Sequence, residues 1–210
     1  APTVTTAVDA LNAQIECGDA TALANALEAV PQATDACGTP ILQVVSDDIT
    51  NSCGATFTRV RVWNFKDANG NTSANYTQTI TVSDTTPPTI VCVENTTRAT
   101  QANACSYTVV GTEFDATASD GCTSPSLTWS VSGATTISGA TTMNGVVLAK
   151  GLNTITWTAT DDCQLTSICS FEVMVNDLTA PTVTTAVDAL NAQIECGDAT
   201  ALASALAQVP

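Results

Sequence analysis

The sequence contains no histidine, and only five of its 210 residues are lysine or arginine, against twenty aspartates and glutamates. Its formal net charge at pH 7 is −15. Without histidine, neither a Ser-His-Asp triad nor a Cys-His pair can be assembled, which excludes enzymes built on them. Nucleic acid is excluded as a partner because phosphate binding depends on lysine and arginine, and an anionic membrane surface is disfavoured for the same reason.

Aromatic and charged residues are also scarce, at 4% and 12% of the chain. Neutral polar groups must therefore cover the surface, and the abundant threonine, together with valine and isoleucine, favours β-strands. No apolar run is long enough to span a bilayer, and no signal peptide or sorting motif is present. The composition indicates a β-rich protein with no membrane-spanning segment in this stretch.

The sequence repeats itself. Residues 180–210 copy residues 1–31 at an offset of 179, and only positions 25, 28 and 29 differ between the copies. Near-identity over a whole segment is typical of tandem arrays that arose by recent duplication. We therefore expect the chain to be one repeat unit followed by the opening of the next, with neighbouring units as its partners.

A shorter echo divides the unit into two. Residues 79–88 and 172–181 each read as a strand that ends at an aspartate and is followed by a short linker ending in proline. Proline fixes φ and favours an extended approach, so these linkers should be stiff. The pattern predicts domains at 1–86 and 87–179, with 180–210 beginning a third.

The first domain should contain one short helix near residues 20–30. Asp19 is a suitable N-cap, and Leu23, Leu27 and Val30 follow at helical spacing, so this stripe should pack on one end of the domain. Short alternating strands separated by glycine, asparagine and proline fill the remainder of both domains. In the strand over 153–160, the alternation places Ile155, Trp157 and Ala159 on one side. This spacing predicts an all-β chain of tandem immunoglobulin-like β-sandwiches.

Several motifs carry a family resemblance. The second domain resembles a hyalin repeat in residues 84–92, 118–122, 151–161 and 169–173, and the first domain resembles a related bacterial surface module in residues 15–19, 33–38, 59–63 and 67–71. The resemblance implies an immunoglobulin-like module of giant secreted adhesins of the Bacteroidetes type, located at the cell surface. The chain departs from the family in having Asn69, where a cysteine is common, and an additional Cys163.

Nine cysteines without a CxxC motif or histidine argue against zinc and favour disulfides, which places the protein outside the cytoplasm. The hyalin resemblance implies the pairs Cys92–Cys169 and Cys105–Cys122. Each domain has an odd number of cysteines while the unit has eight, so either each domain carries a free thiol or one disulfide crosses the boundary. Our hypothesis is Cys17–Cys163 across the junction and Cys37–Cys53 within the first domain. The main rival is Cys122–Cys163, which would leave Cys105 free to reach the next unit.

Calcium is the one metal that the sequence suggests. Asp67, Asn69 and Asn71 alternate along a turn and could offer oxygen ligands, although such turns are common without metal. The linker acids Asp84 and Asp177, near loop acids such as Asp120 and Asp162, could form a similar site at a junction. In the alternative interpretation, all of these are solvated turn residues.

Other candidate sites are weaker. Adjacent carboxylates at Asp47-Asp48 and Asp161-Asp162 should point to opposite faces of a strand, which does not suit acid/base catalysis, and we predict no enzyme. The tryptophans could stack on sugars, but alternation favours core packing. Asp84-Thr85-Thr86 resembles a Bacteroidetes O-glycan acceptor at Thr85. The preferred function is a structural repeat that spaces or displays an adhesive region; the alternative is a multivalent glycan-binding module.

Overall fold

The computed structural model describes residues 1–181 and 199–207. Residues 1–176 form one compact unit, and residues 177–210 form another. Most of the expected third domain lies outside the described residues. Within it, helix α2 spans Ala199–Leu206, at the position that the repeat offset assigns to the copy of α1 (Ala20–Glu28).

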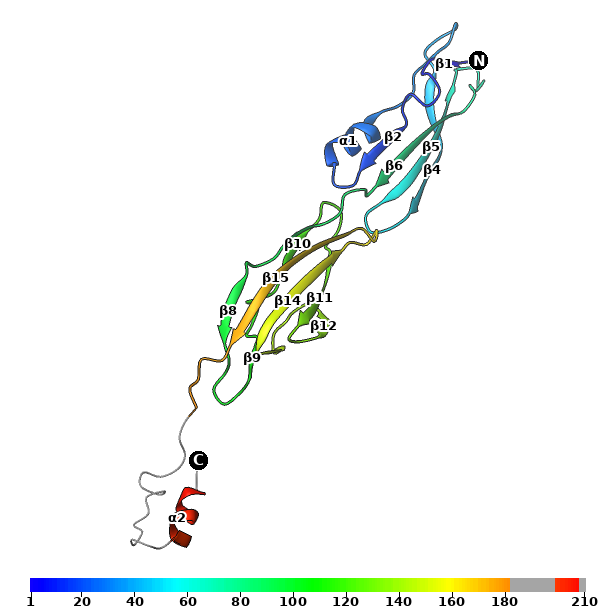
Figure 1. The fold of residues 1–210 in the computed structure, drawn as a ribbon. Coiled ribbons are helices and arrows are strands. Elements are labelled where there is room, and N and C mark those ends of the chain that lie inside the picture. The colour runs from blue at the N-terminus through cyan, green and yellow to red at the C-terminus, as the bar shows by residue number, and fades with distance from the viewer. Residues whose placement is uncertain (182–198, 208–210) are drawn as a thin grey trace. The chain divides into compact units, whose positions relative to one another are not determined.

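The strands of the larger unit fall into two groups that do not pair with each other in the part of the chain that the structure describes (Figure 1). The first group comprises β1 Thr3–Val4, β2 Ala13–Glu16, β3 Ala33–Thr34, β4 Ile41–Asn51, β5 Phe57–Lys66 and β6 Tyr76–Ser83. It forms a four-stranded sheet of order β2-β6-β5-β4 and a short β1-β3 pair. The linker over residues 84–88 contains no strand and separates the two groups.

The second group forms a five-stranded sheet of order β12-β11-β14-β15-β8, together with the pairs β10-β7 and β13-β9. Its strands are β7 Thr89–Val91, β8 Thr96–Ala99, β9 Ser106–Thr108, β10 Thr117–Ser119, β11 Ser126–Gly133, β12 Ile137–Ala140, β13 Val147–Ala149, β14 Gly151–Thr160 and β15 Thr166–Asn176. The chain is therefore all-β, a tandem of immunoglobulin-like sandwiches with one short helix in its first part.

Helix α1 covers one face of the four-stranded sheet. Ala26 is buried with Ile15, Ile80 and Val82 of β2 and β6, and Leu23 packs against the same cluster. Asp19 is the N-cap as predicted, because its carboxylate accepts from the amide of Ala22 at 2.9 Å. The helix packs on the face of the sheet toward the junction end of the domain, where Cys122 of the second sandwich joins the same cluster. Val30 lies beyond the helix and is exposed, so it is not part of the apolar stripe.

The core of the second sandwich is built around tryptophan and phenylalanine. Ile155, Trp157 and Ala159 of β14 are fully buried, which confirms the predicted alternation. The indole of Trp157 donates to the carbonyl of Phe114 at 2.9 Å. A large apolar ring with its one polar group satisfied is stable in the interior. These contacts fix the long β14–β15 hairpin, whose turn carries Cys163.

Candidate functional site at the junction

A disulfide joins the two sandwiches. Cys53 follows β4 in the first sandwich, and Cys163 lies in the β14–β15 turn of the second; their Cα atoms are 5.1 Å apart. The bond encloses a sequence separation of 110 residues. It therefore links strands that share no hydrogen-bonded sheet.

Our expectation that one disulfide would cross this boundary and involve Cys163 is met, but its partner was wrong. The sheet order β2-β6-β5-β4 places the ends of β2 and β4 at opposite edges of the first sheet. Cys17 follows β2, whereas Cys53 follows β4. Both cysteines lie at the junction end of the sheet, and only the β4 edge meets the β14–β15 turn.

The expected Cys37–Cys53 pair is also wrong. Cys37 precedes β4 and Cys53 follows it, so an 11-residue strand separates them. At about 3.3 Å per residue, that strand holds them more than about 30 Å apart, far beyond disulfide reach. Cys37 is an exposed thiol. It shares a surface hollow with Asn69.

Of the two pairs implied by the hyalin resemblance, Cys92–Cys169 is present. Cys105–Cys122 is not, and both residues are thiols. The carbonyl of Cys105 accepts from the amide of Lys150, just before β14, whereas Cys122 lies near the other end of that strand, where Thr160 pairs with Ser126. The ten-residue length of β14 separates the two thiols by roughly 30 Å. The rival Cys122–Cys163 pair is excluded because Cys163 is bonded to Cys53.

Gly54 allows the sandwiches to approach closely beside the disulfide. It has a φ of +54°, and a Cβ there would lie 2.7 Å from the Thr123 methyl group and 3.1 Å from the Cβ of Asp162. Both the backbone conformation and the space therefore require glycine. The turn that presents Cys163 is held by Asp161, a buried residue whose carboxylate accepts from the amides of Cys163 and Leu165 at 2.8 and 2.9 Å.

The linker between the sandwiches is tied to the first one by Glu16. Its carboxylate accepts from the amide and hydroxyl of Thr85 and from the hydroxyl of Thr86, at 2.7–2.9 Å. The bonds from Thr85, and then that from Thr86, hold the pKa of Glu16 below its ordinary value. Pro88 at the end of the linker is buried. The linker is thus anchored at both ends, and the stiffness that its prolines suggest stays a prediction. Thr85 is exposed, as a glycosylated residue would have to be, and its glycosylation stays a prediction.

Two of the expected junction acids come together. Asp84 and Asp120 place carboxylate oxygens within 4.8 Å of the thiol of Cys122. Asp120 also accepts from the amide of Cys122 at 2.7 Å, which shapes the loop after β10. One oxygen of Asp84 is buried without a hydrogen bond. A thiol is a poor calcium ligand, so this cluster does not resemble the oxygen-only calcium site that the sequence suggested.

The turn predicted to bind calcium connects β5 to β6. Asp67 accepts from the amides of Asn69 and Asn71 at 2.9 and 2.8 Å, and from the side chain of Asn71 at 2.8 Å. The bonds from Asn71 lower the pKa of Asp67 most, and the bond from Asn69 lowers it further. The three residues line one hollow together with Asp35. The hydrogen bonds account for the turn without a metal, and calcium binding there stays a prediction.

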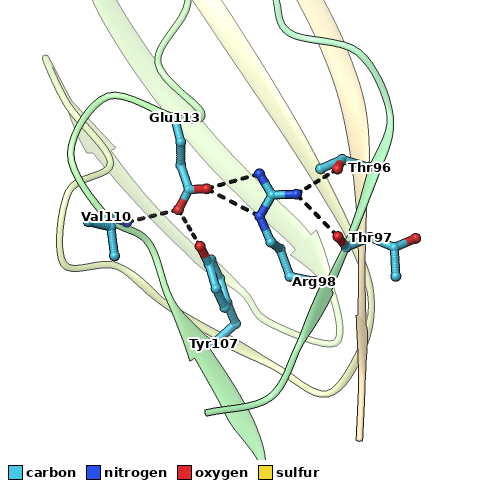
Figure 2. A network of polar contacts seen from close by, with 6 residues as sticks. All are labelled: Thr96, Thr97, Arg98, Tyr107, Val110 and Glu113. Atoms are coloured by element: carbon cyan, nitrogen blue, oxygen red, sulfur yellow. Dashed lines mark hydrogen bonds and ion pairs between the residues drawn. The ribbon is translucent and has the colours of Figure 1, made fainter. Parts of the chain in front are cut away.

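A polar network supports the second sandwich from within (Figure 2). Glu113 accepts from the Arg98 guanidinium at 3.0 and 3.2 Å, from the Tyr107 hydroxyl at 2.6 Å and from the amide of Val110 at 2.9 Å. Burial favours the neutral acid, but the bonds from Tyr107, Val110 and Arg98 outweigh it and lower the pKa of Glu113. Arg98 also lies 5.2 Å from the centre of the Phe114 ring. The network ties edge strand β8 to the core.

The remaining candidate residues have structural partners. Asp47 forms a two-pronged ion pair with Arg59, at 2.6 and 2.7 Å, on neighbouring strands. Trp63, Trp129 and Trp157 are all buried, as their alternation predicts. Of the nine aromatic residues, seven are buried, and Phe57 and Tyr107 are half-buried. No helix among the described residues is both long and apolar enough to cross a membrane.

Comparison with known families is consistent with this geometry. Residues 83–175 match the HYR domain family, and residues 4–82 match the family described as HYR-like domain with 4 cysteines. The chain contains hyalin-repeat modules. The two matches meet at the linker, so the disulfide from Cys53 to Cys163 connects one hyalin-repeat module to the next. The first module has three cysteines, Cys17, Cys37 and Cys53, against the four in the family's description.

No curated protein matches the chain. Among solved structures, it is similar to fibronectin(III)-like modules of Clostridium thermocellum CbhA, at 16% identity and a TM-score of 0.35, covering 87% of this chain and 99% of that one. It is also similar to Drosophila N-cadherin EC1-3, at 14% identity and a TM-score of 0.31, and the match covers 84% of this chain and 68% of that one. It is likewise similar to protocadherin Gamma B2 extracellular cadherin domains 1–5, at 14% identity and a TM-score of 0.35, and the match covers 86% of this chain and 40% of that one. At these TM-scores the likeness adds nothing to the assignment.

Proposed function

We propose that the chain is a structural repeat unit of a long extracellular surface adhesin or filament, in which it spaces or displays an adhesive region. The observation that carries this proposal is the Cys53–Cys163 disulfide between consecutive hyalin-repeat modules. Disulfides persist in oxidising environments, which supports an extracellular location. Neighbouring copies of the unit are the proposed partners, and a Bacteroidetes-type source is part of the proposal.

The position of the disulfide suits a chain that bears tension. Two domains joined by a short linker alone ordinarily move relative to each other. Here, force that enters through residues before Cys53 passes directly to Cys163 and β15, so the segment between the two cysteines, a sequence separation of 110, is not stretched. The pairings β5–β6 and β11–β14 lie wholly within that shielded segment. A spacer built in this way keeps its length under load.

The alternative, a multivalent glycan-binding module, finds less support because every tryptophan is buried. A glycan array probed with the 210-residue chain distinguishes the two functions. The structural proposal predicts no binding above that of an unrelated sandwich domain. Saturable binding to a defined glycan would overturn it in favour of the alternative.

A second experiment tests the spacer directly. Spin labels attached through non-natural residues at exposed Thr77 and Glu172 report the distance between the two modules without using cysteine. In the background Cys17→Ala, Cys122→Ala, the proposal predicts a narrow distance distribution that broadens when Cys53→Ser and Cys163→Ser are added. A broad distribution in the background chain would contradict a fixed junction.

A further inference from the structure

Two further cysteines meet across the same junction. Cys17 follows β2 in the first module and is buried. Cys122 lies between β10 and β11 in the second module, and it packs against the first module's cluster of Cys17, Ile15 and Val82. Residues from the two modules therefore share one apolar cluster at the β2 edge of the first sheet, opposite the edge that carries Cys53.

The backbones next to these cysteines are in contact. Gly18 has a φ of +88°, and a Cβ there would lie 2.7 Å from the carbonyl oxygen of Gly121. A Cβ on Gly121 would lie 3.9 Å from the carbonyl oxygen of Cys17. A disulfide requires Cα atoms about 4.4–6.8 Å apart, and only segments that touch in this way meet that condition. Glycine at both neighbouring positions removes the side chains that would hold the segments apart.

The surroundings favour a disulfide over a metal site. Burial first, and then the neighbouring Cys17 and Asp84, raise the pKa of the Cys122 thiol. Metal ligation requires the thiolate, which this environment disfavours. Asp84 and Asp120 lie beside the thiol, and their negative charges also oppose its ionisation. A disulfide is neutral and suits a half-buried apolar cluster.

We propose that Cys17 and Cys122 form a second disulfide across the junction. Both S–H bonds break and one S–S bond forms, and the two electrons and two protons pass to the disulfide of a thiol–disulfide oxidoreductase, which becomes a dithiol. The two cross-links then stand at opposite edges of a four-stranded sheet, about three strand spacings or roughly 14 Å apart. One bond allows rotation about itself, whereas two separated bonds fix the orientation of the modules. This inference does not depend on whether the array is adhesive.

Peptide mapping without reduction tests the proposal on the full 210-residue chain carrying Cys196→Ser, because residues 188–197 would otherwise give a peptide identical to residues 9–18. The chain is secreted through an oxidising compartment and alkylated before digestion. Trypsin alone leaves Cys17 and Cys53 in one peptide, because no lysine or arginine precedes Arg59. Additional cleavage before aspartate isolates Cys17 in residues 9–18 and Cys122 in residues 120–150. The expected result is one linked pair of these two peptides, lighter by two hydrogen atoms than the separate thiols. Alkylated Cys17, or a bond from Cys17 to any other cysteine, would overturn the proposal.

Thiol counting in denaturant provides a matched control. In the background Cys37→Ser, Cys105→Ser, Cys196→Ser, the proposal predicts no label from a maleimide, because all six remaining cysteines are bonded. Adding Cys122→Ser should expose one thiol, that of Cys17. Two labels in the background chain would contradict the proposal. Two labels that appear only after a chelator is added, together with one zinc per chain by elemental analysis, would also contradict the proposal, because they would indicate a metal site in place of a disulfide.

Discussion

Single residues decide how closely the two modules approach, and Gly54 is the clearest case. We predict that Gly54→Ala destabilises the chain by the cost of a positive φ, about 1–2 kcal/mol, plus about 1–3 kcal/mol for the overlap with Thr123 and Asp162. Gly111→Ala is the matched control, since Gly111 has a φ of +60° but nothing within 4 Å of an added Cβ. Denaturant unfolding checks the difference. Equal losses for the two variants would show that the junction contact contributes nothing.

Glu113 makes the stability of the second module depend on pH. Its pKa is lower in the folded chain than in the unfolded one, so its contribution is present above about pH 4.3 and is lost as the pH falls through the folded pKa. We predict that Glu113→Gln costs about 1–2 kcal/mol at pH 7, and that the difference from the unmodified chain shrinks at lower pH. Glu172→Gln, an exposed change on β15, should cost almost nothing. A loss that is the same at pH 7 and pH 3 would refute the charged role of Glu113.

At the scale of elements, the sequence predicted local features correctly but did not predict the order of the strands within a sheet. The cap at Asp19 and the alternation along β14 act within a few residues, so the sequence predicted both. Parity left two alternatives, a free thiol in each domain or one disulfide across the boundary. Our hypothesis of a disulfide through Cys163 is confirmed. Parity could not identify Cys53 as the partner, because order along the chain does not state which edge of a sheet a strand occupies. The parallel pairing of β2 with β6 decides that, and it joins residues far apart in the sequence.

The distance that a strand places between two cysteines was the other information that the disulfide predictions lacked. Cys37–Cys53 was our hypothesis for the first domain, and the hyalin resemblance implied Cys105–Cys122. The structure interposes β4 between the first two cysteines, and β14 lies between the positions of the second two. Strands β8, β10 and β12 have three or four residues each, which is too short for an alternating pattern to be recognised in the sequence.

The β5–β6 turn tests the calcium hypothesis at the scale of one element. Only the backbone amide of Asn69 takes part in the hydrogen bonds of the turn, so Asn69→Ala should leave the turn intact while removing one possible metal ligand. If calcium binds there, titration calorimetry with calcium chloride should show one site, weakened several-fold in the variant. No heat of binding in the unmodified chain would end the calcium hypothesis for this turn. Asp67→Ala is unsuitable as a control because it also removes three hydrogen bonds.

For the whole molecule, the central claim is that load crosses the junction through the Cys53–Cys163 disulfide. The two disulfides of the structure overlap: one encloses a separation of 110 residues, and Cys92–Cys169 encloses 77. Under tension the first disulfide removes its whole segment from the extensible path. Without it, only the shorter segment would be removed.

Single-molecule stretching measures this path most directly. The chain is pulled from its two ends without reductant, in the background Cys17→Ala, Cys122→Ala so that only the observed disulfides act, with and without Cys53→Ser. We predict that the serine variant releases 33 more residues, the difference between the two enclosed segments, which is roughly 120 Å at about 3.6 Å per residue. Full reduction of the background chain should release all 110 residues, roughly 400 Å. Equal extension of the oxidised chains with and without Cys53 would contradict a load path through the disulfide.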